Sequence, residues 1–217
     1  MIIDPKKLHD QEWLERKKDY DSIAGSCRYK IILDIIINGK PESVLDMGCG
    51  SGYLGFLIKK SAPQITVHGF DISDVALVKT EMIDLKYQLD LDKQDIPQTD
   101  GYYDVAVCSE LLEHIYDVKH GLEEMYRILK RGGLGIITVP NHGFWKFRLH
   151  SLIGKLPSII ADERHLHTFN LALLKQKTEE AGFKVSKVDG CRSRFLILNK
   201  ISTSLFSDTI ILQVEKS

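Results

Sequence analysis

The sequence lacks a long, uninterrupted apolar segment. Its most apolar stretch, Ile31–Ile37, is interrupted by Asp34, whereas a helix that spans a bilayer needs about 20 apolar residues in succession. Charged residues already occur at Asp4 and Lys6, so the beginning of the chain shows no apolar core of a secretory signal. These features predict no stable membrane insertion and a cytoplasmic location.

Cysteine is scarce, and charge of either sign is not in excess. The cysteines lie far apart at Cys27, Cys49, Cys108 and Cys191 without any C-x-x-C pair. This spacing fits neither a zinc site nor a disulfide framework, so we expect reduced thiols. The formal net charge is -1, which gives no broad basic surface for nucleic acid and favours a small-molecule partner.

A glycine-rich stretch follows a short apolar segment at residues 43–46. Gly48, Gly50 and Gly52 alternate with other residues, and a pattern that starts a helix follows. Glycines here let the backbone turn sharply and approach a ligand at the helix N-terminus, as in nucleotide-type cofactor sites. Two interpretations compete. In the first, residues 50–55 match the dinucleotide fingerprint G-x-G-x-x-G, with Asp71 as its ribose acid. In the second, the acid comes before the glycines, in the pattern Asp46-x-Gly48-x-Gly50-x-Gly52.

Segments with strand and helix patterns alternate along the chain, which predicts an α/β fold with helices on both faces of a mostly parallel sheet. We expect a helix at residues 22–37, although the isoleucines also suit a strand. A further helix begins after Asp117 and is stopped by Gly132 and Gly133. Strands are expected at residues 43–46, 65–71, 87–91, 103–109, 134–139, 183–188 and 209–214.

Four segments together resemble class I S-adenosylmethionine (SAM) dependent methyltransferases of the UbiE/UbiG-like type (methyltransferase type 11). They are Val44–Gly52, His68–Ser73, Tyr103–His114 and Arg127–Pro140, and the similarity covers about residues 40–190. The resemblance implies a Rossmann-like, doubly wound sheet of seven strands with an antiparallel last strand. It also implies methyl transfer from SAM, with S-adenosylhomocysteine as the product, and favours the interpretation in which Asp46 precedes the glycines.

The resemblance also implies which residues bind the cofactor. Asp71 would accept hydrogen bonds from both ribose hydroxyls through its two carboxylate oxygens. Asp90 and Leu91 match the position at the adenine edge, but Asp92 and Asp95 compete with Asp90, because this segment can be aligned in more than one register. The complete expected set is Asp46, Gly48, Cys49, Gly50, Asp71, Ile72, Asp90, Leu91, Ser109 and Glu110.

Histidines are the natural candidates for a base near neutral pH. We expect His114 and His167 as catalytic candidates, and His142, Trp145 and His165 as candidates for binding the acceptor. For each histidine, a packing or surface role remains the alternative. We expect no metal, because the pair His165 and His167 has no evident third ligand in the sequence.

The chain divides into an N-terminal helical appendage, residues 1–40, and a SAM-binding domain, residues 41–217. The latter carries an insertion at about 141–168 that has no clear periodicity. Because long loops in compact domains are often functional, we expect this insertion to cover the acceptor site as a lid, together with the N-terminal helix. The alternative for its aromatic residues, such as Phe144 and Phe147, is a membrane-facing or dimer surface.

The sequence therefore predicts a SAM-dependent methyltransferase that acts on a small molecule, with oxygen favoured over carbon or nitrogen. Nucleic acid is disfavoured as the acceptor, since the fourth strand continues as Ser109–Leu112 instead of an Asn-Pro-Pro-aromatic motif. Two alternatives remain. One is an NAD(P)-dependent oxidoreductase with the same glycine loop, and the other is a non-catalytic SAM-binding protein.

Overall fold

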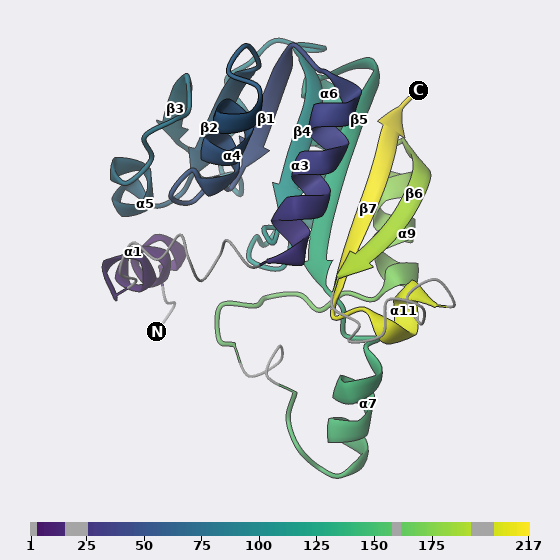
Figure 1. Ribbon diagram of the computed structural model, residues 1–217. Coiled ribbons are helices and arrows are strands. Elements are labelled where there is room, and N and C mark those ends of the chain that lie inside the picture. The colour runs from purple at the N-terminus through teal and green to yellow at the C-terminus, as the bar shows by residue number, and fades with distance from the viewer. Residues whose placement is uncertain (1–3, 16–25, 158–161, 192–201) are drawn as a thin grey trace.

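A single sheet forms the centre of the computed structural model, which describes residues 4–15, 26–157, 162–191 and 202–217 (Figure 1). Its strand order is β3-β2-β1-β4-β5-β7-β6. The strands are β1 (Ser43–Met47), β2 (Thr66–Asp71), β3 (Leu85–Gln88), β4 (Tyr103–Ser109), β5 (Leu129–Pro140), β6 (Phe183–Cys191) and β7 (Thr209–Lys216). Only β7 runs antiparallel to its neighbours, β5 and β6. The predicted seven-stranded, mostly parallel sheet is confirmed.

Helices cover both faces of this sheet, and each layer encloses its own apolar core. On one face, α3 (Cys27–Gly39) and α4 (Tyr53–Ser61) bury residues such as Ile32 and Ile58. On the other face, α6 (Val118–Ile128) and α9 (Leu171–Glu180) bury Leu122 and Leu174. Two short helices, α5 (Asp74–Val78) and α11 (Thr203–Phe206), complete this part of the fold.

The isoleucine-rich segment at residues 31–37 is helical, as expected from its length. Ile32 and Ile36 lie one helical turn apart and are both fully buried against the sheet. α3 was assigned to an appendage that ended at residue 40, yet the structure packs it into a core of the main domain. The beginning of the predicted helix, residues 22–25, lies outside the described residues.

The glycine pair Gly132–Gly133 does not end a helix, and this expectation was wrong. α6 ends at Ile128, and β5 begins at the next residue. The register then shifts from Tyr103 opposite Leu129 to Val105 opposite Leu134, so the residues between form a bulge. Gly132 adopts a φ of 73° there. The two glycines mark a bulge within a strand. Glycine also commonly follows the end of a helix, so the two cases look alike in sequence.

The expectation of four reduced thiols was also wrong, because Cys27 and Cys191 form a disulfide. Their Cα atoms lie 5.8 Å apart, although the two residues are separated by 164 positions in the sequence. Cys49 and Cys108 are free and buried. Sequence spacing could not reveal this bond, since only the fold brings the start of α3 to the end of β6.

Two helices lie away from the faces of the sheet. α1 (Pro5–Glu15) lies beyond the carboxyl ends of β1 and β2, whereas α7 (Trp145–Leu152) projects from the body of the protein (Figure 1). α1 is attached to α5 by Asp10 Oδ1, which accepts a 2.6 Å hydrogen bond from Ser73 Oγ. α7 contains no buried residue. Among the described residues, no helix is both long and apolar enough to cross a membrane.

Replacing Gly55 by alanine should destabilise the fold. A Cβ at this position in α4 would lie 2.6 Å from Cγ1 of Ile83, which packs against the core. We expect Gly55→Ala to lower the free energy of unfolding by about 1–3 kcal/mol, the usual range for overpacking. Urea unfolding of the purified variant measures this change.

Gly39→Ala is the matched control, since a Cβ there meets no atom within 4 Å at the end of α3. It should leave stability unchanged or raise it by about 0.5–1 kcal/mol, because alanine favours a helix more than glycine does. Equal unfolding curves for Gly55→Ala and the wild type would contradict the packing argument.

Candidate functional site

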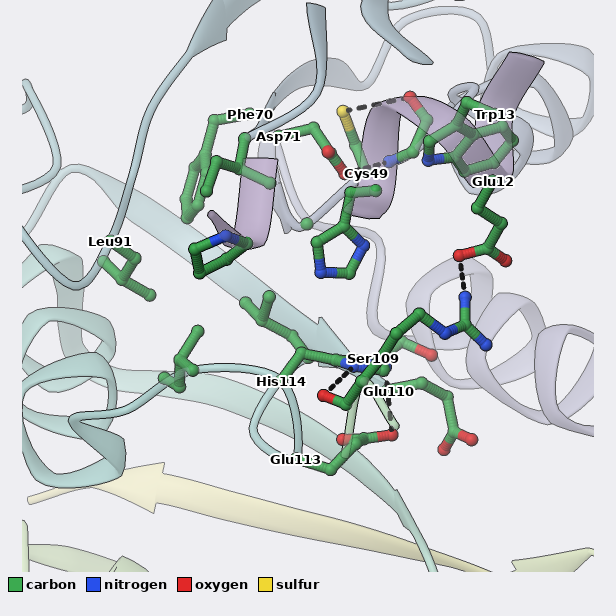
Figure 2. A pocket seen from close by; sticks show the side chains of 18 of the residues that line it. Glu12, Trp13, Cys49, Phe70, Asp71, Leu91, Ser109, Glu110, Glu113 and His114 are labelled. Carbon is green, nitrogen blue, oxygen red and sulfur yellow. Dashed lines mark hydrogen bonds and ion pairs between the residues drawn. The ribbon is translucent and has the colours of Figure 1, made fainter. Parts of the chain in front are cut away.

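A cavity of about 470 Å³ opens at the carboxyl ends of β1, β2 and β4 (Figure 2). The loops that follow these strands line the cavity, together with residues of α1, of α3 and of the chain near Arg164. Because the chain leaves β1 for β2 on one side and β4 lies on the other, the loops diverge here, as at the ligand crevice of open α/β sheets. The cavity therefore lies where the sequence predicted the cofactor.

The glycine loop is held against the end of β2 by Asp71. Gly50 N donates a 2.8 Å hydrogen bond to Asp71 Oδ2, and Ser73 N donates a 2.9 Å bond to Asp71 Oδ1. Gly48 and Gly50 have φ values of 68° and 53°, a region that residues with a Cβ rarely adopt. Each carboxylate oxygen retains acceptor capacity, so Asp71 can still receive hydroxyl hydrogens from a ligand.

The cofactor candidates lie together, with one exception. Gly48, Cys49, Gly50, Asp71, Ile72, Asp90, Leu91, Ser109 and Glu110 all line the cavity. Asp46 does not line it and is 4% exposed within β1. Burial, followed by the nearby charge of Asp71, raises the pKa of Asp46 to about 8. This carboxyl group is therefore protonated at neutral pH and lies beside the cavity without forming its wall.

Of the three competing acids, Asp90 and Asp92 line the cavity and Asp95 does not. Asp92 accepts hydrogen bonds from the backbone N–H groups of Tyr116 and Asp117, at 3.0 and 2.9 Å. Its two oxygens therefore hold the turn that precedes α6. Asp90 instead makes contacts within its own turn, because Oδ1 accepts a 3.2 Å hydrogen bond from Asp92 N and Oδ2 pairs with the exposed Lys93 at 2.6 Å. Asp90 is accordingly the better candidate to face a ligand.

These residues fit the parts of SAM. The glycine loop leaves open backbone for an amino acid tail, Asp71 suits ribose hydroxyls, and apolar Leu91 beside Asp90 suits an adenine. A Cβ at Gly50 would lie 2.7 Å from Trp13 Cζ2. The indole of α1 therefore closes over the glycine loop, and any larger residue at position 50 would collide with it.

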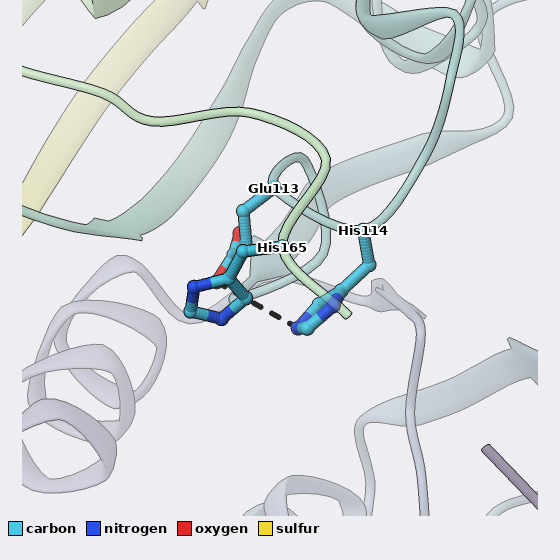
Figure 3. Close-up of side chains that lie close together, drawn as sticks. All are labelled: Glu113, His114 and His165. Carbon is cyan, nitrogen blue, oxygen red and sulfur yellow. Dashed lines mark ion pairs between the residues drawn. The ribbon is translucent and has the colours of Figure 1, made fainter. Parts of the chain in front are cut away.

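The opposite half of the cavity brings β4 and the end of the insertion together. Glu110, Glu113 and His114 follow β4, while Arg164 and His165 come from the insertion. The Glu113 carbonyl oxygen accepts hydrogen bonds from the N–H groups of Leu166 and His167, at 2.7 and 3.2 Å. His114 Nδ1 lies 3.1 Å from the Arg164 carbonyl oxygen. These contacts hold His114 and His165 beside Glu113 (Figure 3).

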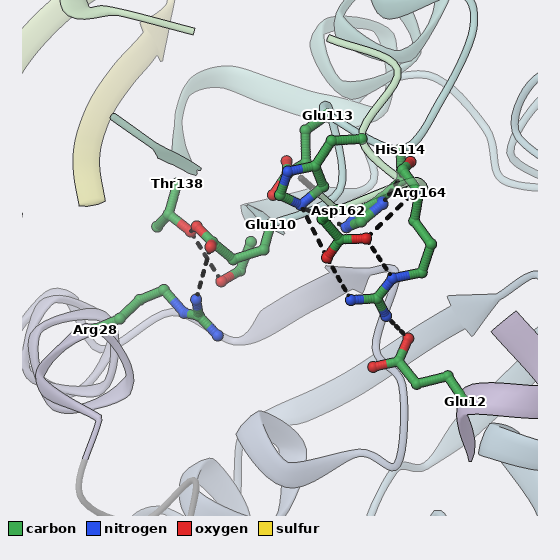
Figure 4. Close-up of polar contacts among 10 residues, drawn as sticks. Glu12, Arg28, Glu110, Glu113, His114, Thr138, Asp162 and Arg164 are labelled. Atoms are coloured by element: carbon green, nitrogen blue, oxygen red, sulfur yellow. Dashed lines mark hydrogen bonds and ion pairs between the residues drawn. The ribbon is translucent and has the colours of Figure 1, made fainter. Parts of the chain in front are cut away.

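Ion pairs surround this half (Figure 4). Arg28 of α3 contacts Glu110 at 3.1 Å. Arg164 contacts Asp162 at 2.6 Å and also pairs with Glu12 of α1. Burial raises the pKa of Glu110 more than Arg28 lowers it. The end of the insertion is thus joined to α1, and α3 supplies a cation to the acid that follows β4.

Glu113 and His114 are both desolvated. Glu113 is 1% exposed, and neither of its carboxylate oxygens has a hydrogen-bond partner among the described residues. Burial raises the pKa of Glu113 well above its ordinary value, and Glu110 raises it further. Burial lowers the pKa of His114 to about 4, so its imidazole is neutral at physiological pH and has a lone pair.

Three of the residues expected near the acceptor lie elsewhere. His167 Nε2 lies 3.3 Å from the Tyr116 carbonyl oxygen, outside the cavity lining. His142 N donates a 2.7 Å hydrogen bond to the Phe169 carbonyl oxygen, next to the bridge between Asn141 and Phe169, and Trp145 is on the projecting α7. Of the residues 141–168 expected as a lid, the described ones that line the cavity are Arg164 and His165. α1, the other part of the expected lid, lines the cavity, whereas the aromatic residues of the insertion do not.

Sequence reasoning missed several lining residues: His9, Trp13, Arg28, Glu113 and Arg164. Glu113 could have been found, because it adjoins His114 in a motif after the fourth strand. Arg164 likewise adjoins the expected His165, whereas His9, Trp13 and Arg28 come from helices that approach the cavity only through tertiary packing. His9, for example, contacts His114 edge to face at 5.3 Å between ring centres.

Comparison with known proteins gives one family. Residues 26–188 match a family model described as a methyltransferase domain. A ubiquinone biosynthesis O-methyltransferase from Nitrosomonas europaea is 33% identical over 129 residues, which cover 56% of this chain and 54% of that protein. A probable S-adenosylmethionine-dependent methyltransferase from Mycolicibacterium smegmatis is 28% identical over 151 residues, covering 69% and 54%. The chain thus spans about half the length of these relatives.

A solved structure agrees in fold. A SAM-dependent methyltransferase from Archaeoglobus fulgidus superposes with a TM-score of 0.66 and 20% sequence identity, covering 87% of this chain and 94% of the other. At this level of identity the similarity supports the arrangement of strands and helices alone.

Replacing Gly50 by valine should abolish cofactor binding. The residue has a positive φ, and its side-chain position is filled by the Trp13 indole, so a branched side chain must displace both the loop and α1. We expect affinity for S-adenosylhomocysteine to fall on the order of 100-fold or more, equivalent to about 2.7 kcal/mol. Isothermal titration calorimetry measures this loss.

Gly132→Val is the matched control for backbone strain, because Gly132 also has a positive φ but no atom lies within 4 Å of its Cβ position. This variant should lose stability and keep its affinity. A similar loss of affinity in both variants would contradict the role assigned to the loop.

Asp46 should make stability fall as pH rises. Its pKa is about 8 in the folded protein against a reference value of 3.8, so the unfolded chain releases this proton near pH 4 and the folded protein retains it. Between these values, one proton changes the free energy of unfolding by up to about 1.4 kcal/mol per pH unit. Urea unfolding at pH 5, 6, 7 and 8 should show a shallower decline for Asp46→Asn than for the wild type. Parallel declines would refute this assignment.

Proposed function

The chain belongs to the methyltransferase domain family, and we propose that it transfers a methyl group from SAM to a hydroxyl oxygen of a small-molecule acceptor. One observation carries this proposal. A single cavity joins a half suited to SAM, with the glycine loop and Asp71, to a half lined by His114 and His165. A ligand in the first half would present its reactive end to the second.

For this reaction the protein mainly has to position the cofactor and the acceptor, because the cofactor itself supplies the electrophile. Bound SAM supplies a sulfonium methyl carbon that an oxygen lone pair attacks as the carbon–sulfur bond breaks, which yields a methyl ether, S-adenosylhomocysteine and one proton. Asp71 and Asp90 hold the nucleoside end, and α1 covers the glycine loop. His114 and His165 orient the acceptor hydroxyl from the opposite wall. His167 has no direct part, since it lies outside the cavity lining.

The charges of the cavity support a neutral acceptor. Its two guanidinium groups are already paired, Arg28 with Glu110 and Arg164 with Asp162. Neither has to be released to accommodate an uncharged alcohol or phenol, whereas an anionic acceptor would compete with these acids. The Nitrosomonas europaea relative bears the name of an O-methyltransferase, which supports oxygen as the acceptor atom.

Incubation with methyl-labelled SAM and a panel of neutral alcohols, phenols and amines should test this function. We expect the label in a methyl ether, with one S-adenosylhomocysteine formed per methyl group transferred, because the pocket offers histidines to a hydroxyl. Mass spectrometry identifies the product. Thermal shift provides the control: S-adenosylhomocysteine should stabilise the protein, and NADH should not. Stabilisation by NADH alone, or label transfer to amines alone, would refute the proposal.

A further inference from the structure

Three side chains on the acceptor side of the cavity converge as the ligands of a metal ion do. Glu113, His114 and His165 each offer one ligand atom, and these atoms all lie within 4.8 Å of one another (Figure 3). Metal–ligand bonds of about 2.0–2.2 Å place neighbouring ligand atoms about 3–3.5 Å apart. The side chains therefore need to move together only slightly to bind one ion.

Glu113 provides an independent indication of a bound cation. It is buried, and both carboxylate oxygens lack a hydrogen-bond partner among the described residues. A buried polar group without a partner destabilises a protein. The neighbouring guanidinium groups do not relieve this penalty, because Arg28 binds Glu110 and Arg164 binds Asp162 and Glu12 (Figure 4). A cation between Glu113 and the histidines would satisfy it.

The backbone presents both histidines to Glu113. The Arg164 carbonyl oxygen lies 3.1 Å from His114 Nδ1, so an Nδ1–H group donates to it and Nε2 keeps its lone pair. Nε2 lies 4.0 Å from Glu113 Oε1. Such a carbonyl contact to the second ring nitrogen is the usual way in which a metal-binding histidine is oriented. The backbone bonds from Leu166 and His167 to the Glu113 carbonyl oxygen hold the chain at His165 beside Glu113, and His165 Nε2 lies 3.8 Å from Asp162 Oδ2.

We infer that Glu113, His114 and His165 bind one divalent first-row transition-metal ion in the acceptor half of the cavity. Two imidazoles with one carboxylate favour ions such as Zn²⁺, Co²⁺ or Mn²⁺ over Ca²⁺, which prefers oxygen ligands alone. Three protein ligands leave coordination positions open to the cavity. The inference replaces the expectation that no metal binds, which considered His165 with His167 and overlooked Glu113.

The role of the ion rests on the proposed function. A bound divalent ion would hold the acceptor's hydroxyl oxygen and lower the pKa of that hydroxyl, so that its proton leaves to water before or during attack on the methyl group. His114 then contributes as a ligand through Nε2 and does not itself remove the proton.

Titration of the purified, metal-free full chain with Co²⁺ tests the site without depending on activity. Visible absorption of Co²⁺ should report one equivalent bound with nitrogen ligands. Glu113→Gln and His165→Gln should each weaken binding at least tenfold. His167→Gln is the matched control, since this histidine lies nearby but outside the cavity lining, and it should bind Co²⁺ as the wild type does.

Several outcomes would overturn the inference: no binding at millimolar Co²⁺, unchanged affinity in both ligand variants, or an equal loss in His167→Gln. If Glu113→Gln does not fold, His165→Gln still decides the question, because His165 lies in a loop. S-adenosylhomocysteine affinity of the variants verifies an intact cofactor half. Co²⁺ binding without any methyl transfer would refute only the proposed function, and methyl transfer without Co²⁺ binding would refute only the metal site.

Discussion

The parallel pairing of β1 with β2 on one side and with β4 on the other determines where the functional groups lie. Met47 is opposite Phe70 of β2 and Cys108 of β4. Each strand therefore ends at the same edge, and the residues that follow, including Gly48, Asp71 and Ser109, meet around one cavity. Because the strands are fixed by buried β-sheet contacts, the loops receive their positions from the core and need little structure of their own.

This arrangement concentrates acids at a buried edge. Burial raises the pKa values of Asp46, Asp71, Glu110 and Glu113, so each requires compensation. Asp71 receives two backbone N–H groups, and Glu110 receives Arg28. Asp46 is neutral at physiological pH. Neither carboxylate oxygen of Glu113 has a hydrogen-bond partner among the described residues, which distinguishes Glu113 from Asp71 and Glu110.

Local sequence patterns predicted the sheet and the cofactor loop, because each of these features is determined by a few consecutive residues. The glycine spacing identified the cofactor loop, and the acid after Phe70 identified the end of β2, since both features depend on a few consecutive residues. Alternating strand and helix patterns predicted the sheet. The same reasoning placed Trp145 near the acceptor, because aromatic residues in a long insertion are compatible with a lid. Only tertiary packing shows that α7 projects from the body of the protein and that none of its residues lines the cavity.

Long-range contacts account for what the sequence did not predict, and they converge on the first turn of α3. Cys27 is bonded to Cys191 at the end of β6, and the adjacent Arg28 reaches Glu110 after β4. Ile32 and Ile36 anchor the following turns in the core. The disulfide thus fixes the N-terminal end of α3, which lies before the buried isoleucines. The same end supplies the cavity with the guanidinium group of Arg28. The sequence does not reveal that Cys27 pairs with Cys191 or that Arg28 pairs with Glu110, since each contact requires the completed sheet.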